Sequence, residues 1–260
     1  MSIQVAIIGK GGSGKSVVAG TLARIFARRG HQVLTLDSDL MPGLAWSLGL
    51  GLDSSAMLTD AVEKNDKGRW RLRRGIGPVR AIERYSVLAP DGVRHLQCGK
   101  LDVEGRQAIM ASINGYYQVI HRLPRSRSFK QWTVIGDLPA GPRQVAYQWA
   151  PYADTFVLMV EPSWKSALTA RRIARILRSK PGATVMPVAS KVTDAGDLHR
   201  VEKMLGEPVV AMIPADRAVA IAERAGVAPI DHDPGSPAMR AINALAATLE
   251  VRSDPHRQAA

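Results

Sequence analysis

Cysteine is nearly absent from this sequence, with Cys98 alone among 260 residues. A lone cysteine cannot form an internal disulfide, which agrees with a reducing cytoplasm. No apolar run approaches the roughly 18 to 20 residues that a transmembrane helix requires, so we expect a soluble protein. The first residues, Met1–Ile8, form an apolar segment without the charged region and cleavage site of a signal peptide. We therefore expect a cytoplasmic location.

Acidic residues are also scarce relative to basic ones. The chain has 35 lysines and arginines against 23 aspartates and glutamates, which gives a net charge of +12. This excess favours a polyanionic partner, such as nucleic acid, an acidic membrane surface or an acidic protein, without choosing among them. The six histidines are scattered and lack the spacing of metal ligands. No zinc site is expected.

Short apolar segments alternate with helical patterns along most of the chain. This alternation predicts an α/β fold, with a mostly parallel central sheet and helices on both faces, arranged as a three-layer sandwich. The length and the lack of an interrupting linker favour one domain over residues 1–252, followed by a disordered tail at 253–260. The expected strands are Ile3–Ile8, Val33–Leu36, Thr133–Ile135, Phe156–Val160, Thr184–Val188 and Val209–Ile213.

Helical periodicity is clearest at Lys15–Arg29, and further helices are predicted at Val103–Arg122 and Pro237–Val251. Residues 64–99 are less regular. We interpret them as a basic surface insertion with two short antiparallel strands, Ser86–Ala89 and Arg94–Gln97. Besides Trp70, this segment contains Arg69, Arg71, Arg73, Arg74, Arg80 and Arg84.

A glycine-rich segment, Gly9–Ser16, reads GKGGSGKS and lies between the first predicted strand and the first predicted helix. It satisfies the G-x-x-x-x-G-K-[ST] pattern of a phosphate-binding loop in the context that the pattern requires. The glycines let the backbone curl so that its N–H groups meet phosphate oxygens at the positive end of the helix dipole. Lys15 supplies positive charge to the β and γ phosphates, and Ser16 can ligate Mg²⁺. We expect ATP and Mg²⁺ as ligands, bound by Gly11, Gly12, Ser13, Gly14, Lys15, Ser16 and Val17.

A second lysine, Lys10, precedes the paired glycines of this loop. The arrangement resembles the deviant Walker A box of the MinD/ParA/nitrogenase iron-protein superfamily of P-loop ATPases. In that superfamily the early lysine crosses a dimer interface to the phosphates of the partner's nucleotide. The resemblance implies a homodimer that forms on ATP binding, with Lys10 and Lys15 as catalytic residues. Val17 departs from the pattern, because a second hydroxyl residue often stands there.

Carboxylates follow two of the predicted strands. Asp37 and Asp39 end the second strand, and Asp137 begins the segment DLPAG after the third. We expect them at the carboxyl edge of the sheet, where open α/β folds bind ligands. The two segments resemble the D-x-D and D-x-P-A-G motifs of the same superfamily. This implies that Asp39 orients or activates the attacking water, and that Asp37 and Asp137 support the metal. The alternative for Asp37 and Asp39 is a solvated turn that caps the next helix. Leu40 is a departure, since proline commonly follows the second aspartate.

Two later segments resemble the part of the superfamily that lies against the nucleotide base. Ile213–Asp216 is similar to a P-x-D element, which assigns Pro214 and Asp216 to the nucleotide site. Lys191 follows Ser190, where many members carry Asn-Lys. Serine has a shorter reach and a different donor set from asparagine, so the base specificity stays open. An ordinary loop explains both segments equally well.

Two features set this chain apart from particular members of the superfamily. Nickel-insertion ATPases of the CooC type, which it resembles in layout, often carry a Cys-x-Cys pair, whereas Gln97-Cys98-Gly99 offers one thiol. Nickel handling through such a pair is therefore not expected, and we expect Cys98 to be a small buried or half-buried residue rather than a nucleophile. MinD ends in an amphipathic membrane-binding helix, whereas this chain ends in AINALAATLE and a polar tail. No direct membrane anchor is expected.

Three functions are consistent with these features. The first is a MinD/CooC-like ATPase that dimerises on ATP and hydrolyses it slowly, to switch its interaction with an unidentified protein partner or complex. The second is a ParA-like ATPase that binds DNA nonspecifically through arginine clusters, including Arg171, Arg175 and Arg178 on one helix face. The alternative explanation of these three arginines is a helix face that is merely exposed to solvent. The third is an ATP-dependent small-molecule transferase or ligase, which Lys10 disfavours because a single-subunit enzyme needs no lysine that crosses an interface.

Overall fold

A computed structural model describes residues 2–41, 43–51, 57–99 and 105–253. Within them, eight strands form one sheet, and a separate hairpin pairs β3 (Val62–Lys64) with β4 (Trp70–Leu72). Neighbouring strands of the large sheet are parallel except β5 and β6, so the predicted mostly parallel sheet is confirmed. In spatial order, the strands are β10 (Ala211–Pro214), β9 (Thr184–Val192), β8 (Thr155–Val160), β1 (Gln4–Gly9), β7 (Thr133–Asp137), β2 (Val33–Asp37), β6 (Arg94–Gln97) and β5 (Val87–Leu88).

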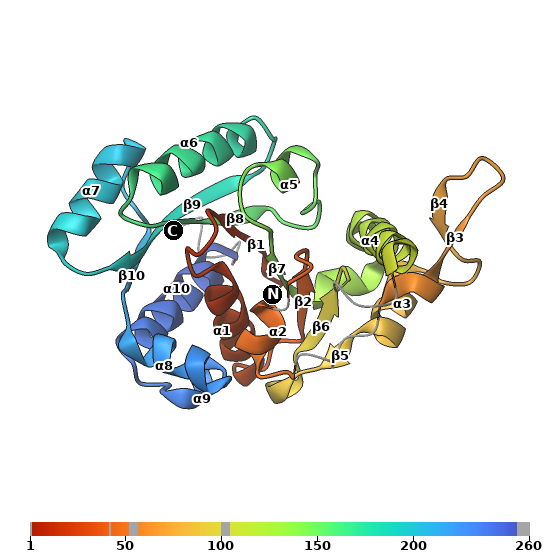
Figure 1. Cartoon of the computed structure of the whole chain (residues 1–260), viewed down its shortest axis with the longest axis horizontal. Helices are drawn as coiled ribbons and strands as arrows, with labels where there is room; N and C mark the ends of the chain where they lie inside the picture. Colours follow the sequence, from red (N-terminus) through yellow and green to blue (C-terminus); the bar gives the residue numbers. More distant parts are fainter. Residues whose placement is uncertain (1, 42, 52–56, 100–104, 254–260) are drawn as a thin grey trace.

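Helices cover both faces of this sheet, as expected for three layers (Figure 1). Alternate residues of β1 show the division: Ala6 and Ile8 belong to one buried cluster, and Val5 and Ile7 to the other. Helices α4, α6 and α7 pack into the first cluster, whereas α1, α2 and α10 pack into the second. The helices of the described chain are α1 (Lys15–Arg28), α2 (Gly43–Leu48), α3 (Pro78–Tyr85), α4 (Gly105–Arg122), α5 (Arg143–Ala146), α6 (Trp164–Arg178), α7 (Ala195–Leu205), α8 (Arg217–Ala225), α9 (Pro229–His232) and α10 (Pro237–Ser253).

The predicted elements agree with the observed ones to within a few residues. Helix α1 begins at Lys15 and ends one residue earlier than predicted, and β10 begins at Ala211 rather than Val209. Short 3-10 helices occur at Leu58–Ala61, Pro90–Gly92, Leu123–Arg125 and Arg127–Gln131. The start predicted for the helix at Val103 lies outside the described residues. Of the tail expected at 253–260, only Ser253 is described, and it is helical as the last residue of α10 rather than part of a disordered tail.

The segment 64–99 is divided between the sheet and a projection. The two predicted strands do pair, as β5 and β6. Strand β6 also pairs in parallel with β2, in the register Leu34↔Arg94 to Asp37↔Gln97, so these two strands form an edge of the central sheet rather than part of a surface insertion. The β3–β4 hairpin, by contrast, extends away from the body of the molecule (Figure 1).

Candidate functional site

The phosphate-loop motif connects β1 to α1 as a tight turn. Gly12 and Gly14 have φ angles of 79° and 83°, a region that L-residues with a side chain rarely adopt. At Gly9, an added Cβ would lie 2.5 Å from the carbonyl oxygen of Met159, so only glycine fits where β1 meets β8. No side chain caps the first turn of α1 among the described residues. The free N–H groups of this first turn and the helix dipole therefore suit the loop to an anionic ligand.

Contacts within the loop hold this curvature. The carbonyl oxygen of Lys10 accepts hydrogen bonds from the Ser13 hydroxyl at 2.8 Å and from Lys15 Nζ at 3.3 Å. The segment that follows β7, residues 138–141, lies against the same loop, because Gly141 N–H donates to the Gly9 carbonyl at 3.1 Å. Both segments thus meet at one edge of the sheet, and Lys15 is a cation at the rim of the anion site.

The three predicted carboxylates lie at the adjacent strand ends. Asp37 of β2 and Asp137 of β7 are direct neighbours in the parallel register, and their exposed fractions are 0% and 3%. Asp37 Oδ1 accepts from the Asp39 backbone N–H at 2.9 Å, and Asp39 Oδ1 accepts from Met41 N–H at 3.2 Å. The three acids are thus brought together at the carboxyl edge, as predicted.

Burial perturbs the two inner acids. It raises the pKa of Asp37 well above the usual value, and repulsion from Asp137 adds to this effect. The pKa of Asp137 rises to about 6 because burial outweighs the opposing hydrogen bond from Ser16 and the charge of Lys15. One oxygen of each carboxyl, Asp37 Oδ2 and Asp137 Oδ1, has no hydrogen-bond partner among the described residues.

The two carboxyl oxygens without a partner indicate whether Mg²⁺ fits this site. A buried carboxylate oxygen without a partner is costly unless a cation occupies the space beside it. Oxygen donors are the ligands that Mg²⁺ prefers, and Ser16 adds a hydroxyl next to Asp137. The residues present therefore suit the expected metal, with Ser16, Asp37 and Asp137 as the protein groups that would hold it. No group of three or more His, Cys, Asp or Glu residues that could hold a metal ion occurs in the described part of the chain, so this candidate site depends on two carboxyls and one hydroxyl.

A cavity of about 550 Å³ continues from the phosphate loop between α8 and α10. Its walls include Lys191, Pro214 and Asp216, together with six of the predicted loop residues: Gly12, Ser13, Gly14, Lys15, Ser16 and Val17. Gly11 and the three carboxylates lie outside the cavity lining, as does Lys10. The site is therefore a partly open pocket next to the glycine-rich loop at the sheet edge, a shape that suits a nucleotide.

Asp216 has a structural role in this pocket. Its Oδ1 accepts from Ala218 N–H at 2.9 Å and caps α8, while Oδ2 accepts from Ala238 N–H at 2.8 Å at the start of α10. Burial opposes ionisation, but these hydrogen bonds together lower the pKa of Asp216. The carboxylate thus joins the two helices that form the pocket wall.

Several pocket residues were not predicted. They are apolar or lie on helices whose orientation no local pattern reveals: Trp46, Met159, Val219, Ala220, Glu223, Ala238 and Ile242. Trp46 carries the one available signal, since a large aromatic residue on the short helix α2 is half-buried and its indole nitrogen has no partner within the described structure. At Ser190, which is 2% exposed, the hydroxyl likewise lacks a described partner.

Cys98 is buried, as predicted, with an exposed fraction of 1%. Burial raises the pKa of its thiol well above the usual value, and the charges of Asp37 and Asp39 act in the same direction. A thiol in this state is a poor nucleophile and a poor metal ligand at neutral pH. None of the helices in the described ranges has both the length and the apolar character needed to cross a membrane.

Comparison with known proteins agrees with this site. Residues 5–251 match the family described as the CobQ/CobB/MinD/ParA nucleotide binding domain. The chain is 27% identical to the carbon monoxide dehydrogenase accessory protein CooC of Rhodospirillum rubrum, over 97% of this chain and 98% of that protein.

Among solved structures, the fold is similar to the septum site-determining protein MinD of Pyrococcus horikoshii OT3 in complex with Mg-ADP. The TM-score is 0.69 at 20% identity, over 98% of this chain and 97% of that chain. A chain of the MinC:MinD cell division protein complex of Aquifex aeolicus has the same score and identity, with 98% of both chains covered. This chain belongs to the CobQ/CobB/MinD/ParA family of nucleotide-binding domains.

Proposed function

We propose that this protein is a cytoplasmic ATPase switch, in which residues 1–252 act as one domain. It binds ATP with Mg²⁺, dimerises, and hydrolyses the nucleotide slowly to change its interaction with a partner protein. The observation that carries the proposal is the junction of an anion cradle, Gly9–Ser16, with two buried carboxyls, each of which has an oxygen without a described partner. A triphosphate and its divalent cation satisfy both parts of this site at once.

Each residue then has a defined task. Lys15 and the loop amides hold the β and γ phosphates, and Ser16, Asp37 and Asp137 hold the cation, which offsets the charge of the γ phosphate when bound. Asp39, next to these groups and partly exposed, orients or activates the attacking water. Lys10, whose side chain is 36% exposed, reaches the nucleotide of a second subunit.

An Asp39→Ala variant tests the switch. Hydrolysis should fall about a hundredfold or more, because a group that positions the water is lost. ATP should then trap a dimer, seen by size-exclusion chromatography with light scattering, while ADP leaves a monomer. The double variant Lys10→Ala/Asp39→Ala should bind ATP by calorimetry and stay monomeric. Lys67→Ala/Asp39→Ala, which changes an exposed lysine of the β3–β4 turn, is the matched control. A monomer of Asp39→Ala at saturating ATP would contradict the proposal.

The partner is proposed to be a protein complex. The MinC:MinD complex, in which one chain has this fold, supports binding of a second protein as a mode for such domains. A pull-down with the ATP-trapped Asp39→Ala protein, compared with the ADP-bound wild type, would identify the partner. Equal recovery of every protein in the two states would count against a nucleotide-dependent interaction.

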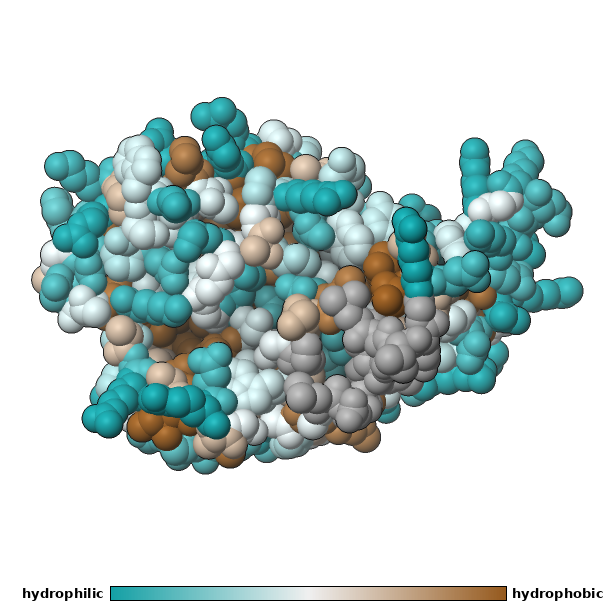
Figure 2. All heavy atoms as spheres, viewed as in Figure 1, coloured by the Kyte–Doolittle hydropathy of each residue, from teal (hydrophilic) through white to brown (hydrophobic). Residues whose placement is uncertain are grey.

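A second candidate function, nonspecific DNA binding, is favoured by the β3–β4 hairpin. Figure 2 shows hydrophilic surface over this projection, and of its basic residues Arg71 pairs with Glu63 at 2.9 Å. The exposed basic residues in and beside the hairpin are Lys64, Lys67, Arg69, Arg71, Arg73 and Arg74. DNA retention that weakens steeply with salt would support this function. The double variant Arg69→Glu/Arg74→Glu should reduce the slope of log binding constant against log salt concentration by about two. No retention at low salt would remove it.

A further inference from the structure

Glu161, the residue directly after β8, lies between the two lysines of the nucleotide site. Its Oε2 is 3.3 Å from Lys10 Nζ, and its Oε1 is 3.3 Å from Lys191 Nζ. The glutamate side chain is 16% exposed, whereas Lys10 is 36% exposed and Lys191 is 55% exposed. One mostly buried carboxylate thus pairs with two partly exposed cations, which no local sequence pattern predicted.

The backbone around Glu161 is anchored on both sides. Its N–H donates to the Ser166 hydroxyl at 3.0 Å, and its carbonyl accepts from Ser163 N–H at 2.7 Å at the start of α6. The preceding strand β8 pairs with β1 up to Gly9↔Met159, beside the phosphate loop. The backbone that carries the carboxylate is therefore fixed, and both lysine side chains reach it.

Lys191 is held at a second point. Its Nζ also donates to the Gly12 carbonyl of the phosphate loop, and its backbone adopts φ 57°, unusual for a residue with a side chain. Glu161 thus connects the loop lysine, Lys10, with a lysine that contacts the loop itself.

We propose that Glu161 is a positioning residue that folds Lys10 back onto its own subunit in the absence of ATP and releases it when two ATP-bound subunits meet. This inference rests on the proposed ATP-dependent dimer. An ammonium group that pairs with Glu161 cannot at the same time reach across an interface, so the glutamate competes with the partner's phosphates. The greater negative charge of the triphosphate favours release once the second subunit is present.

Chemical modification tests the restraint without requiring dimerisation. In nucleotide-free protein, acetylation of Lys10, quantified by mass spectrometry relative to Lys67, should be faster in Glu161→Gln than in wild type. The amide keeps the size of the side chain but loses its charge. Glu63→Gln, which removes the exposed pair with Arg71, is the matched control and should leave the Lys10 rate unchanged. Equal Lys10 rates in wild type and Glu161→Gln would overturn the proposal.

Dimerisation provides the second measurement. In the Asp39→Ala background, Glu161→Gln should lower the ATP concentration at half-maximal dimer by about two- to fivefold, the scale of a partly exposed ion pair. In a Lys10→Ala/Asp39→Ala background, Glu161→Gln can affect the nucleotide only through Lys191. Its effect on the affinity for ATP should therefore be no larger than the effect of Lys191→Ala in the same background. Loss of the dimer in Glu161→Gln would overturn the proposal, since Glu161 would then be needed in the closed state. If Asp39→Ala itself stays monomeric, the proposed function fails, while the acetylation rates still decide whether Glu161 restrains Lys10.

Discussion

His95 in β6 shows how burial changes the chemistry of a single residue. The side chain has no exposed surface; Nδ1 lies 3.0 Å from Thr35 Oγ1, and Nε2 has no partner in the described structure. Burial lowers its pKa from 6.5 to about 4. The folded protein therefore keeps this imidazole neutral at a pH where the unfolded chain binds a proton.

A defined pH dependence follows for His95. Between pH 6.5 and about 4 the unfolded state binds more protons at this residue, so the free energy of unfolding falls as the pH falls. The loss should reach about 3 kcal/mol across the whole window. His95→Asn keeps a group that can bond Thr35 but cannot titrate. The difference between wild type and variant, measured by urea unfolding, should be constant above pH 7 and shrink toward pH 4. A difference that stays constant down to pH 4 would contradict this assignment.

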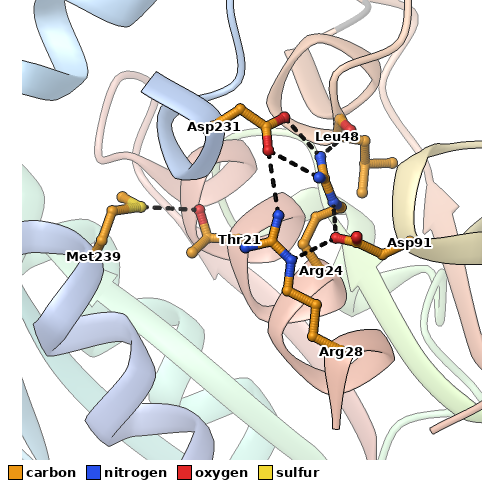
Figure 3. A network of polar contacts seen from close by, with 7 residues as sticks. All are labelled: Thr21, Arg24, Arg28, Leu48, Asp91, Asp231 and Met239. Carbon is orange, nitrogen blue, oxygen red and sulfur yellow. Dashed lines mark hydrogen bonds and ion pairs between the residues drawn. The ribbon is translucent and has the colours of Figure 1, made fainter. Parts of the chain in front are cut away.

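At the scale of elements, the buried side chain of Arg24 joins helix α1 to three other segments of the chain (Figure 3). Arg24 is 3% exposed and donates to Asp231 of α9 at 2.9 Å and 3.0 Å, to the Leu48 carbonyl of α2 at 2.9 Å, and to Asp91 of the 3-10 turn Pro90–Gly92. Arg28, one turn later, contacts both aspartates from a more exposed position. The cluster fixes α2 and α9 against the helix that carries the phosphate loop.

Replacement of Arg24 and of Arg28, one at a time, shows how much burial of the arginine adds to its contribution to stability. Arg24→Met should lower the free energy of unfolding by about 1 to 3 kcal/mol, because the Leu48 carbonyl and two aspartates lose a buried donor. Arg28→Met is the matched control, and its cost should stay below about 1 kcal/mol, since the side chain is 42% exposed. Denaturant unfolding of both variants provides the comparison. Equal costs would show that the Arg24 contacts contribute no more than surface pairs.

At the scale of the whole molecule, the nucleotide site exists only in the folded chain. It combines the ends of β1, β2 and β7 with helices α8 and α10, which are distant in sequence. A ligand that binds only this assembled state stabilises it by mass action. The site is therefore coupled to the stability of the entire fold.

Thermal unfolding measures this coupling. Mg-ADP at about one hundred times its dissociation constant should stabilise the wild type by about 2.7 kcal/mol, which raises Tm by about 5 to 10 °C. Lys15→Ala should reduce the rise at the same ligand concentration, because a phosphate contact is lost, and chelation of Mg²⁺ should reduce it in the wild type. Lys67→Ala serves as the control with an unchanged rise. If Mg-ADP raised the Tm of Lys15→Ala as much as that of the wild type, Lys15 would not contact the nucleotide.

Local patterns predicted most strands, the first helix and the positions of the phosphate loop and the three acids. These features depend on residues close together in the chain, such as the glycine spacing in Gly9–Ser16 or an acid directly after a strand. The role of β6 in the central sheet was not predicted, because its pairing with β2 joins residues about 60 positions apart. A short strand of four residues is compatible with either a free hairpin or a strand of the central sheet.

The sequence by itself determined the fold class and the position of the phosphate-loop motif between β1 and α1, since both follow from spacing along the chain. Only the tertiary structure decided which helices enclose the pocket, how Asp216 joins α8 to α10, and that Glu161 holds Lys10 and Lys191. The physical reason is that these contacts depend on side-chain packing and on charges brought within a few ångströms by distant segments. No local propensity encodes such distances.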